Sequence, residues 1–199
     1  MLVEQRIRNG AGLQQPVADE AALVARAKAL DDGAWETLFN DHYHQLRTYL
    51  RYRVGDPATA EDLASQAFLE AVAGIGRYEY RGVPFRAWLF RIGRNLSNDH
   101  VRRERNRPSP AFTPQEAPSP TRVVEHELEV QQLNAALVHV TDEQRQVLVL
   151  RFLLELSTAE TARVMAKSQG AIKTLQYRAL AAARRALSAI DPSASGRES

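Results

Sequence analysis

Residues 78–107, YEYRGVPFRAWLFRIGRNLSNDHVRRERNR, combine a helical apolar pattern with closely spaced arginines. Five apolar side chains recur at helical spacing and predict a buried stripe: Phe85, Trp88, Leu89, Ile92 and Leu96. A second stripe of the same helix is mostly basic and is expected to face outward: Arg86, Phe90, Arg94, Asn98, Arg102 and Arg105. The pattern therefore predicts a helix over about residues 84–105 that covers a core with its first stripe.

The basic stripe has few acids to offset it, because this stretch holds only Glu79, Asp99 and Glu104. Arginine side chains neutralise phosphates, and exposed aromatic rings stack on unpaired bases. The segment is therefore a candidate for holding single-stranded nucleic acid. The alternative is a solvated basic face with no ligand.

Charge is unevenly distributed along the 199 residues, although the formal net charge is only +2. Residues 17–62 are rich in aspartate and glutamate, whereas residues 163–190 contain neither. This separation suits a protein that contacts nucleic acid with one face and another protein with a second face. Hydrophobic residues make up 44% of the chain, which is enough for one or two compact cores.

Several function classes lack their sequence signals. There is no cysteine, so disulfides, thiolate zinc sites and cysteine nucleophiles are excluded. The five histidines form no ligand motif, and neither a glycine-rich phosphate loop nor a nucleophile elbow occurs. We therefore expect no catalytic residue, no metal and no cofactor.

No signal peptide or apolar stretch of membrane-spanning length is seen, so we expect a cytoplasmic protein that does not contact membranes.

Proline and capping signals divide the chain. Five prolines between residues 108 and 120 predict an extended linker between a domain at 17–107 and another at 121–190, with flexible ends at 1–16 and 191–199. Helices are expected at about 17–30, 34–54, 57–73, 84–105, 122–138, 142–154, 158–166 and 168–189. Helix starts are marked by three local signals: Asp56 before Pro57, Thr141 with Gln144, and Ser157 with Glu160. The predicted fold class is all-α.

The segment from Leu156 to Leu180 has the layout of a helix-turn-helix. Its second helix carries Ile172, Leu175 and Ala179 on one face. Polar side chains occupy the other face: Lys173, Thr174, Gln176, Tyr177 and Arg178. Such a helix can enter the major groove of duplex DNA, where lysine, arginine and glutamine read base edges. The alternative is a helix pair in an ordinary bundle.

Ordered motifs cover most of the chain. The first half carries Asp56-Pro57, Glu61-Asp62-Leu63, Phe68-Leu69, Tyr80-Arg81-Gly82, Phe85 to Ile92, Arg94-Asn95-Leu96, Asp99-His100 and Arg102-Arg103. The second half carries Glu143 to Leu148, Leu150-Arg151-Phe152, Leu156-Ser157, Glu160, Ala162, Gly170 to Lys173 and Tyr177-Arg178-Ala179. In this order the chain resembles bacterial RNA polymerase sigma factors of the extracytoplasmic-function (ECF) type, within the sigma-70 family. That family has two helical domains, region 2 and region 4, joined by a flexible linker.

The resemblance implies a role for each half. In region 2, one set would dock on the clamp helices of the polymerase largest subunit: Asp62, Leu63, Gln66 and Phe68. Of these, Leu63 and Phe68 have an alternative role as core residues. A second set would bind the melted −10 promoter element: Tyr80, Arg81, Arg91, Arg94, Asn95, Asn98, Arg102 and Arg103. The loop from Tyr78 to Pro84 and Asn95 match the family's pocket for a flipped base, and the alternative for Asn95 is a surface amide.

In region 4, the resemblance implies contact with the −35 element through the polar face of the second helix: Lys173, Thr174, Gln176, Tyr177 and Arg178. Other implied partners are the polymerase flap and an anti-sigma factor. The chain departs from the family at Ser65-Gln66, at Ala166 in the turn and at Leu175-Gln176. We expect the turn to avoid a left-handed residue at Ala166 or to shift. The implied function is promoter-specific initiation, and the alternative is a stand-alone helix-turn-helix regulator.

Overall fold

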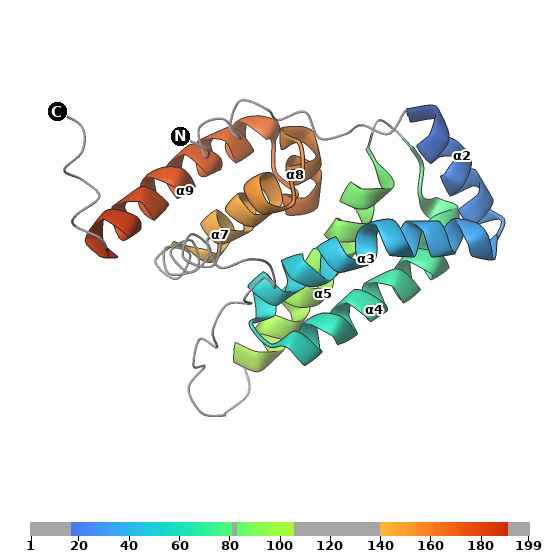
Figure 1. Ribbon diagram of the computed structural model, residues 1–199, viewed down its shortest axis with the longest axis horizontal. Coiled ribbons are helices and arrows are strands. Elements are labelled where there is room, and N and C mark those ends of the chain that lie inside the picture. The colour runs from blue at the N-terminus through green and yellow to red at the C-terminus, as the bar shows by residue number, and fades with distance from the viewer. Residues whose placement is uncertain (1–16, 81–82, 106–139, 191–199) are drawn as a thin grey trace, which may run out of the picture.

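The computed structural model describes residues 17–80, 83–105 and 140–190, in which all regular structure is helical (Figure 1). The all-α prediction is therefore confirmed. In chain order the elements are α2 (Val17–Lys28), α3 (Asp32–Val54), α4 (Pro57–Gly74), η1 (Ile75–Arg77), α5 (Phe85–Arg105), α7 (Asp142–Leu148), η2 (Val149–Leu153), α8 (Thr158–Met165) and α9 (Gln169–Ile190). The predicted linker, the helix expected at 122–138 and both chain ends lie outside these ranges. The domain boundaries stay a prediction.

The predicted helix starts are correct because each rests on a local hydrogen bond. The carboxylate of Asp56 accepts from the Thr59 amide at 2.7 Å, with Pro57 in the first turn of α4. Thr141 begins α7 with a capping box in which its hydroxyl and the Gln144 side chain each bond to the other's backbone amide. A side-chain acceptor at such a position stabilises a helix by about 1 kcal/mol.

The helix expected at 142–154 changes character in its second half. The backbone amide of Leu154 donates to the carbonyl of Val149 at 3.0 Å, a π-type bond five residues back. The α-helix α7 therefore ends at Leu148, and the wider turn η2 follows it. Sequence periodicity cannot separate an α-helix from such a short π turn.

Helices α3, α4 and α5 form the first bundle, which Figure 1 shows with α2 packed across one end. The core is built from large side chains that are fully buried: Leu38, Leu46, Tyr49, Leu50, Phe85, Leu89 and Phe90. Helices α3 and α5 approach closely at Gly93, where an added Cβ would lie 2.8 Å from Cδ1 of Leu46. Each buried large apolar side chain contributes roughly 1.5–3 kcal/mol.

Aromatic rings surround Phe85 at the start of α5. Its ring centroid lies 6.2 Å from Trp35, 5.8 Å from His42, 6.0 Å from Tyr78 and 5.6 Å from Trp88. Trp88 is half-buried in this cluster, so it belongs to the packing as predicted. The cluster joins α3, α5 and the segment before α5 into one unit.

Helices α7, α8 and α9 form the second unit, and α8 packs along α5. The prediction that the second stripe of α5 faces outward is wrong for its first half. Phe90 is fully buried, and Arg86 and Arg94 bond to side chains of α8 and α7. This part of the stripe places the apolar Phe90 between two arginines, a combination that can pack against another helix.

Candidate nucleic-acid and polymerase interfaces

The residues predicted to bind the −10 strand separate into two groups on α5. Arg91, Asn95, Arg102 and Arg103 are exposed. Arg102 lies 3.2 Å from the carboxylate of Asp99, and both side chains are mostly in solvent. An exposed pair of this kind contributes little stability, so Arg102 remains available to a phosphate. These four side chains form a polar and basic surface over the middle and end of α5.

Arg94 and Asn98 are half-buried and already bonded. The Arg94 Nε atom donates to Oε1 of Gln146 on α7 at 3.0 Å. The same oxygen accepts from the Tyr49 hydroxyl at 3.2 Å, and Gln146 is only 3% exposed. Asn98 accepts from Nη2 of Arg53 at 2.6 Å. Sequence reasoning did not find this network, because it joins residues more than 40 positions apart.

Arg86 forms an ion pair with Glu160 on α8. Its Nη2 and Nε atoms donate to Oε1 of Glu160 at 2.7 Å and 3.1 Å. Glu160 also completes the capping box of α8, accepting from the Ser157 amide at 2.7 Å. Burial alone would raise the pKa of Glu160, but the Ser157 and Arg86 hydrogen bonds outweigh it and hold the pKa below its usual value.

The segment before α5 was predicted to form part of a base pocket. The Tyr78 hydroxyl donates to the Val83 carbonyl at 2.6 Å, which holds the two ends of this segment together. Tyr80 is half-buried and packs against the core. Arg81 lies outside the described residues. The role of Tyr80 in binding a base stays a prediction.

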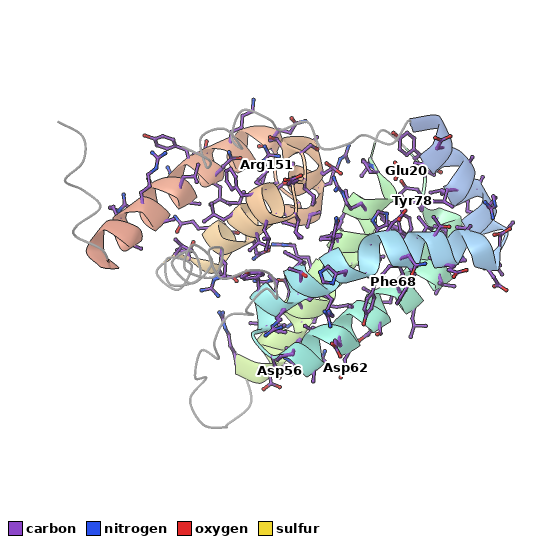
Figure 2. All side chains as sticks on the ribbon, in the orientation of Figure 1. Glu20, Asp56, Asp62, Phe68, Tyr78 and Arg151 are labelled. Carbon is purple, nitrogen blue, oxygen red and sulfur yellow. The ribbon has the colours of Figure 1, made fainter. Side chains whose placement is uncertain are left out.

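Two of the residues predicted to bind polymerase are exposed on α4, and two are not. Asp62 and Gln66 are in solvent, whereas Leu63 and Phe68 are 5% and 6% exposed. Phe68 packs against Phe39, with ring centroids 5.0 Å apart. Figure 2 shows Asp62 and Phe68 on this helix. The structure thus gives Leu63 and Phe68 the alternative role of core residues that support the surface.

Sequence reasoning missed apolar side chains beside Asp62 and Gln66. Leu69 is 70% exposed on α4, and Val72 on the same helix and Phe39 on α3 are also exposed. An exposed apolar patch bordered by polar groups is typical of a protein interface. The sequence could have indicated this patch, because Leu69 follows Phe68 directly and does not fall at the helical spacing of the buried residues of α4.

The polar face of α9 is presented to solvent at four of the five predicted positions. Lys173, Thr174 and Arg178 are exposed, and Tyr177 is 76% exposed. On the opposite face, Ile172 and Ala179 are fully buried. This division matches the predicted helix-turn-helix.

Gln176 differs from its neighbours because it is half-buried and bonded. Its Oε1 atom accepts from Nε of Arg151 at 3.2 Å, and Arg151 also donates to the Leu156 carbonyl. Figure 2 shows Arg151 beneath α9. The acceptor oxygen of Gln176 is therefore engaged within the fold, and its predicted contact with the −35 element stays a prediction.

The turn between α8 and α9 contradicts the expectation at Ala166. Ala166 adopts the left-handed conformation, with φ 53° and ψ 45°, and its backbone amide bonds to carbonyls of α8. The turn therefore keeps the left-handed residue and places alanine there, which costs about 1 kcal/mol relative to glycine. On its far side, the Ser168 hydroxyl accepts from the Ala171 amide at 3.1 Å and starts α9.

Comparison with known proteins identifies both halves. The Sigma-70 region 2 family matches residues 38–107, and the Sigma-70 region 4 family matches residues 130–182. The ECF RNA polymerase sigma factor BldN of Streptomyces coelicolor is 41% identical over 177 residues, covering 84% of this chain and 67% of BldN. The chain belongs to the ECF sigma factors. SigD of Mycobacterium tuberculosis, another ECF sigma factor, is 32% identical over 80% of this chain and 79% of its own length.

The fold of this sigma factor is shared with a solved relative. The structure of CnrH in complex with the cytosolic domain of CnrY matches with a TM-score of 0.66 and 25% identity, over 85% of this chain and 97% of CnrH. Within the sigma factor, the region 2 match begins inside α3, so α2 precedes it. The region 4 match includes α7, α8 and most of α9.

In the part of the sigma factor that the structure describes, no group of three or more acidic, histidine or cysteine side chains is arranged to hold a metal ion. Across those same ranges, no helix combines the length and apolarity that crossing a bilayer requires.

Proposed function

We propose that this ECF sigma factor binds core RNA polymerase and directs it to promoters by contacting both the −10 and the −35 elements. Region 2 would hold the melted −10 strand, and region 4 would dock on −35 duplex DNA. The protein itself would perform no covalent chemistry. The observation that carries the proposal is one chain with two separate basic surfaces, one on α5 and one on α9, each in its own sigma-family match.

The −10 role is supported by the exposed part of α5. Arg91, Arg102 and Arg103 offer guanidinium groups to backbone phosphates. Asn95 presents an amide, which can both donate to and accept from a base edge. Flipping a base out of a duplex costs a few kcal/mol, and these contacts would offset that cost.

The −35 role is supported by the free face of α9. Lys173 and Arg178 can bond to guanine in the major groove, and Tyr177 adds an exposed ring. Gln176 is best assigned to positioning, because Arg151 holds its oxygen. At Leu175-Gln176, where the sequence departs from the family pattern, Leu175 packs against the core and the Gln176 amide is bonded to Arg151.

The polymerase role is assigned to the outer face of α4. Asp62 and Gln66 lie there as polar groups, with Leu69 and Val72 as apolar contacts. We expect this face to bind the clamp helices of the largest subunit, and region 4 to contact the flap.

The relative CnrH was solved with the cytosolic domain of another protein, CnrY. We accordingly expect a comparable protein partner, an anti-sigma factor, for this chain.

Run-off transcription tests the proposal. Purified core polymerase is combined with this chain and a library of promoters that vary at −10 and −35. The expected result is initiation that depends on the chain and on both elements. A chain that binds −35 duplexes but gives no initiation with core polymerase would contradict the proposal and would favour the stand-alone regulator.

A further inference from the structure

Helix α5 starts without a local side-chain cap. Phe85 is its first residue, and the two residues before it, Val83 and Pro84, have no side-chain acceptor. The Pro84 carbonyl accepts the amides of Ala87 at 3.0 Å and Trp88 at 3.3 Å. The amide of Phe85 itself needs an acceptor from elsewhere, because the first amides of a helix have no acceptor within it.

Glu20 supplies that acceptor from α2, 65 residues earlier in the chain. Its Oε1 atom accepts from the Phe85 amide at 2.5 Å. A carboxylate in this place makes a charge-assisted hydrogen bond and also interacts favourably with the positive end of the helix dipole. Glu20 is half-buried, so solvent screens this interaction only in part.

The same carboxylate lies beside the residues that lead into α5. Figure 2 shows Glu20 and Tyr78 close together at this end of the bundle. Burial raises the pKa of the Tyr78 hydroxyl, and the negative charge of Glu20 adds to that effect. The hydroxyl donates to the Val83 carbonyl, so Tyr78 fixes Val83 while Glu20 fixes Phe85 two residues later.

We propose that Glu20 is a positioning residue for −10 recognition, which it serves by capping α5 and fixing the backbone between Val83 and Phe85. The proposal rests on the proposed function, because that backbone joins Tyr80 to the α5 surface that carries Asn95. Glu20 does not itself touch DNA. Helix α2 lies outside the region 2 match, so the cap is contributed by a segment that the family match does not include.

The mechanism follows from the packing around Phe85. Its ring is fully buried between Trp35, His42, Tyr78 and Trp88. If Glu20 is removed, the Phe85 amide loses its acceptor, and the first turn of α5 frays or moves to reach water. A loosened first turn frees the segment that holds Tyr80 to shift relative to Asn95, and base selection depends on fixed donors and acceptors, so discrimination between bases falls more than overall affinity.

The test compares Glu20→Ala, Glu20→Gln and a matched control, Asp19→Ala, in holoenzyme reconstituted with core polymerase. Asp19 is the adjacent exposed acid on α2. Binding of single-stranded −10 oligonucleotides, one for each base at each position, is measured by fluorescence anisotropy. Binding of a −35 duplex to the same holoenzymes provides a readout for region 4.

The expected result is a specific loss in one variant. For Glu20→Ala, the affinity ratio between the preferred and the poorest base falls by up to about fivefold, which would correspond to the whole contribution of one helix cap. Glu20→Gln retains an acceptor oxygen and keeps most of the discrimination. Asp19→Ala matches the wild type, and −35 binding is the same in all four proteins.

Three results would overturn the proposal. The first is unchanged discrimination in Glu20→Ala, and the second is an equal loss in Glu20→Gln. The third is a loss of −10 and −35 binding together with a lowered melting temperature, which would indicate general destabilisation. A wild-type holoenzyme with no base preference at −10 would instead overturn the proposed function, and the Glu20 proposal would fall with it.

Discussion

The two basic surfaces of this sigma factor differ in how much of each is free. On α9, Lys173, Thr174, Tyr177 and Arg178 point into solvent. On α5, the exposed residues begin at Arg91, and both Arg86 and Arg94 are bonded to the second unit. The surface proposed for duplex DNA is therefore presented to solvent except at Gln176, and the surface proposed for the melted strand is partly used for internal packing.

This difference shows that a basic stripe has two uses in one fold. Arginine has a long apolar stem and a planar head with several donors, so it can support packing and bind a carboxylate or amide at the same time. Arg86 and Arg94 do this around the buried Phe90. A nucleic acid that reaches Arg94 must therefore replace the oxygen of Gln146.

The largest expected effect concerns His42 on α3, whose ring stacks against that of Phe85 at the start of α5. Burial, with a smaller contribution from Arg86, lowers the pKa of His42 from 6.5 to about 4. The unfolded chain binds this proton near pH 6.5 and the folded chain only near pH 4, so stability is lost as the pH falls through that window. We expect this group to lower the free energy of unfolding by about 3 kcal/mol between pH 7.5 and pH 4.

Urea unfolding at several pH values measures this effect. His42→Gln should show a pH dependence that is flatter by that amount, whereas His44→Gln, an exposed neighbour on α3, should keep the wild-type profile. If His42→Gln and the wild type show the same dependence between pH 6.5 and pH 4, the imidazole is not held neutral.

The α9 side is tested by Arg178→Ala. Loss of a specific base contact costs about 2 kcal/mol at one base pair, so this variant should lose its preference at one −35 position. Arg102→Ala on α5 is the comparison: it should weaken binding evenly across sequences and reduce the salt slope by about one. Binding of −35 and −10 variants at several salt concentrations gives both values. If Arg178→Ala instead lowered DNA affinity by the same factor for every −35 sequence, the proposed distinction between the two surfaces would be removed.

The internal use of α5 is tested by Arg86→Ala. The change removes the arginine that pairs with Glu160, whose side chain is only 10% exposed. We expect the free energy of unfolding to fall by roughly 1.5 kcal/mol, because a hydrogen-bonded charge loses its compensation. Arg91→Ala, on the exposed part of the same helix, should change it by less than about 0.5 kcal/mol. Equal effects from the two variants would show that the Glu160 contact is not formed in solution.

The smallest expected effect is a stabilisation on the α9 side. Ala166→Gly relieves the left-handed alanine, so the free energy of unfolding should rise by about 1 kcal/mol. Ala171→Gly, in the regular first turn of α9, should lower it by about 0.5–1 kcal/mol. Thermal unfolding of both variants gives the signs. A loss of stability in Ala166→Gly would mean that the turn is not left-handed in solution.

Local signals explain how much of this fold could be predicted from the sequence. The starts at Asp56, Thr141 and Ser157 depend on residues within three positions, and the sequence predicts them correctly. The apolar spacing around Phe85 and Leu89 likewise predicts a buried face. These features follow from helical geometry alone.

Contacts between distant residues account for what the sequence did not predict. Nothing near Gln146 indicates that it bonds to Arg94, and nothing near Glu20 indicates that it caps α5. The ring of Phe90 packs against that of Tyr49 on α3, with centroids 5.7 Å apart, and α5 also packs against α8, where the Arg86–Glu160 pair joins residues 74 positions apart. In the same way, the bond from Arg151 to Gln176 changes the expected role of a surface glutamine.

Gln146 meets both Tyr49 and Arg94 with an uncharged oxygen. A glutamate there would meet the guanidinium as a full charge, and parting the two halves would then break an ion pair. With a carboxamide, parting exposes a dipole that water solvates at modest cost. The choice of amide over acid lowers the cost of opening the seam at this point, whereas the Arg86–Glu160 ion pair is a second contact that any partner separating the halves would have to break.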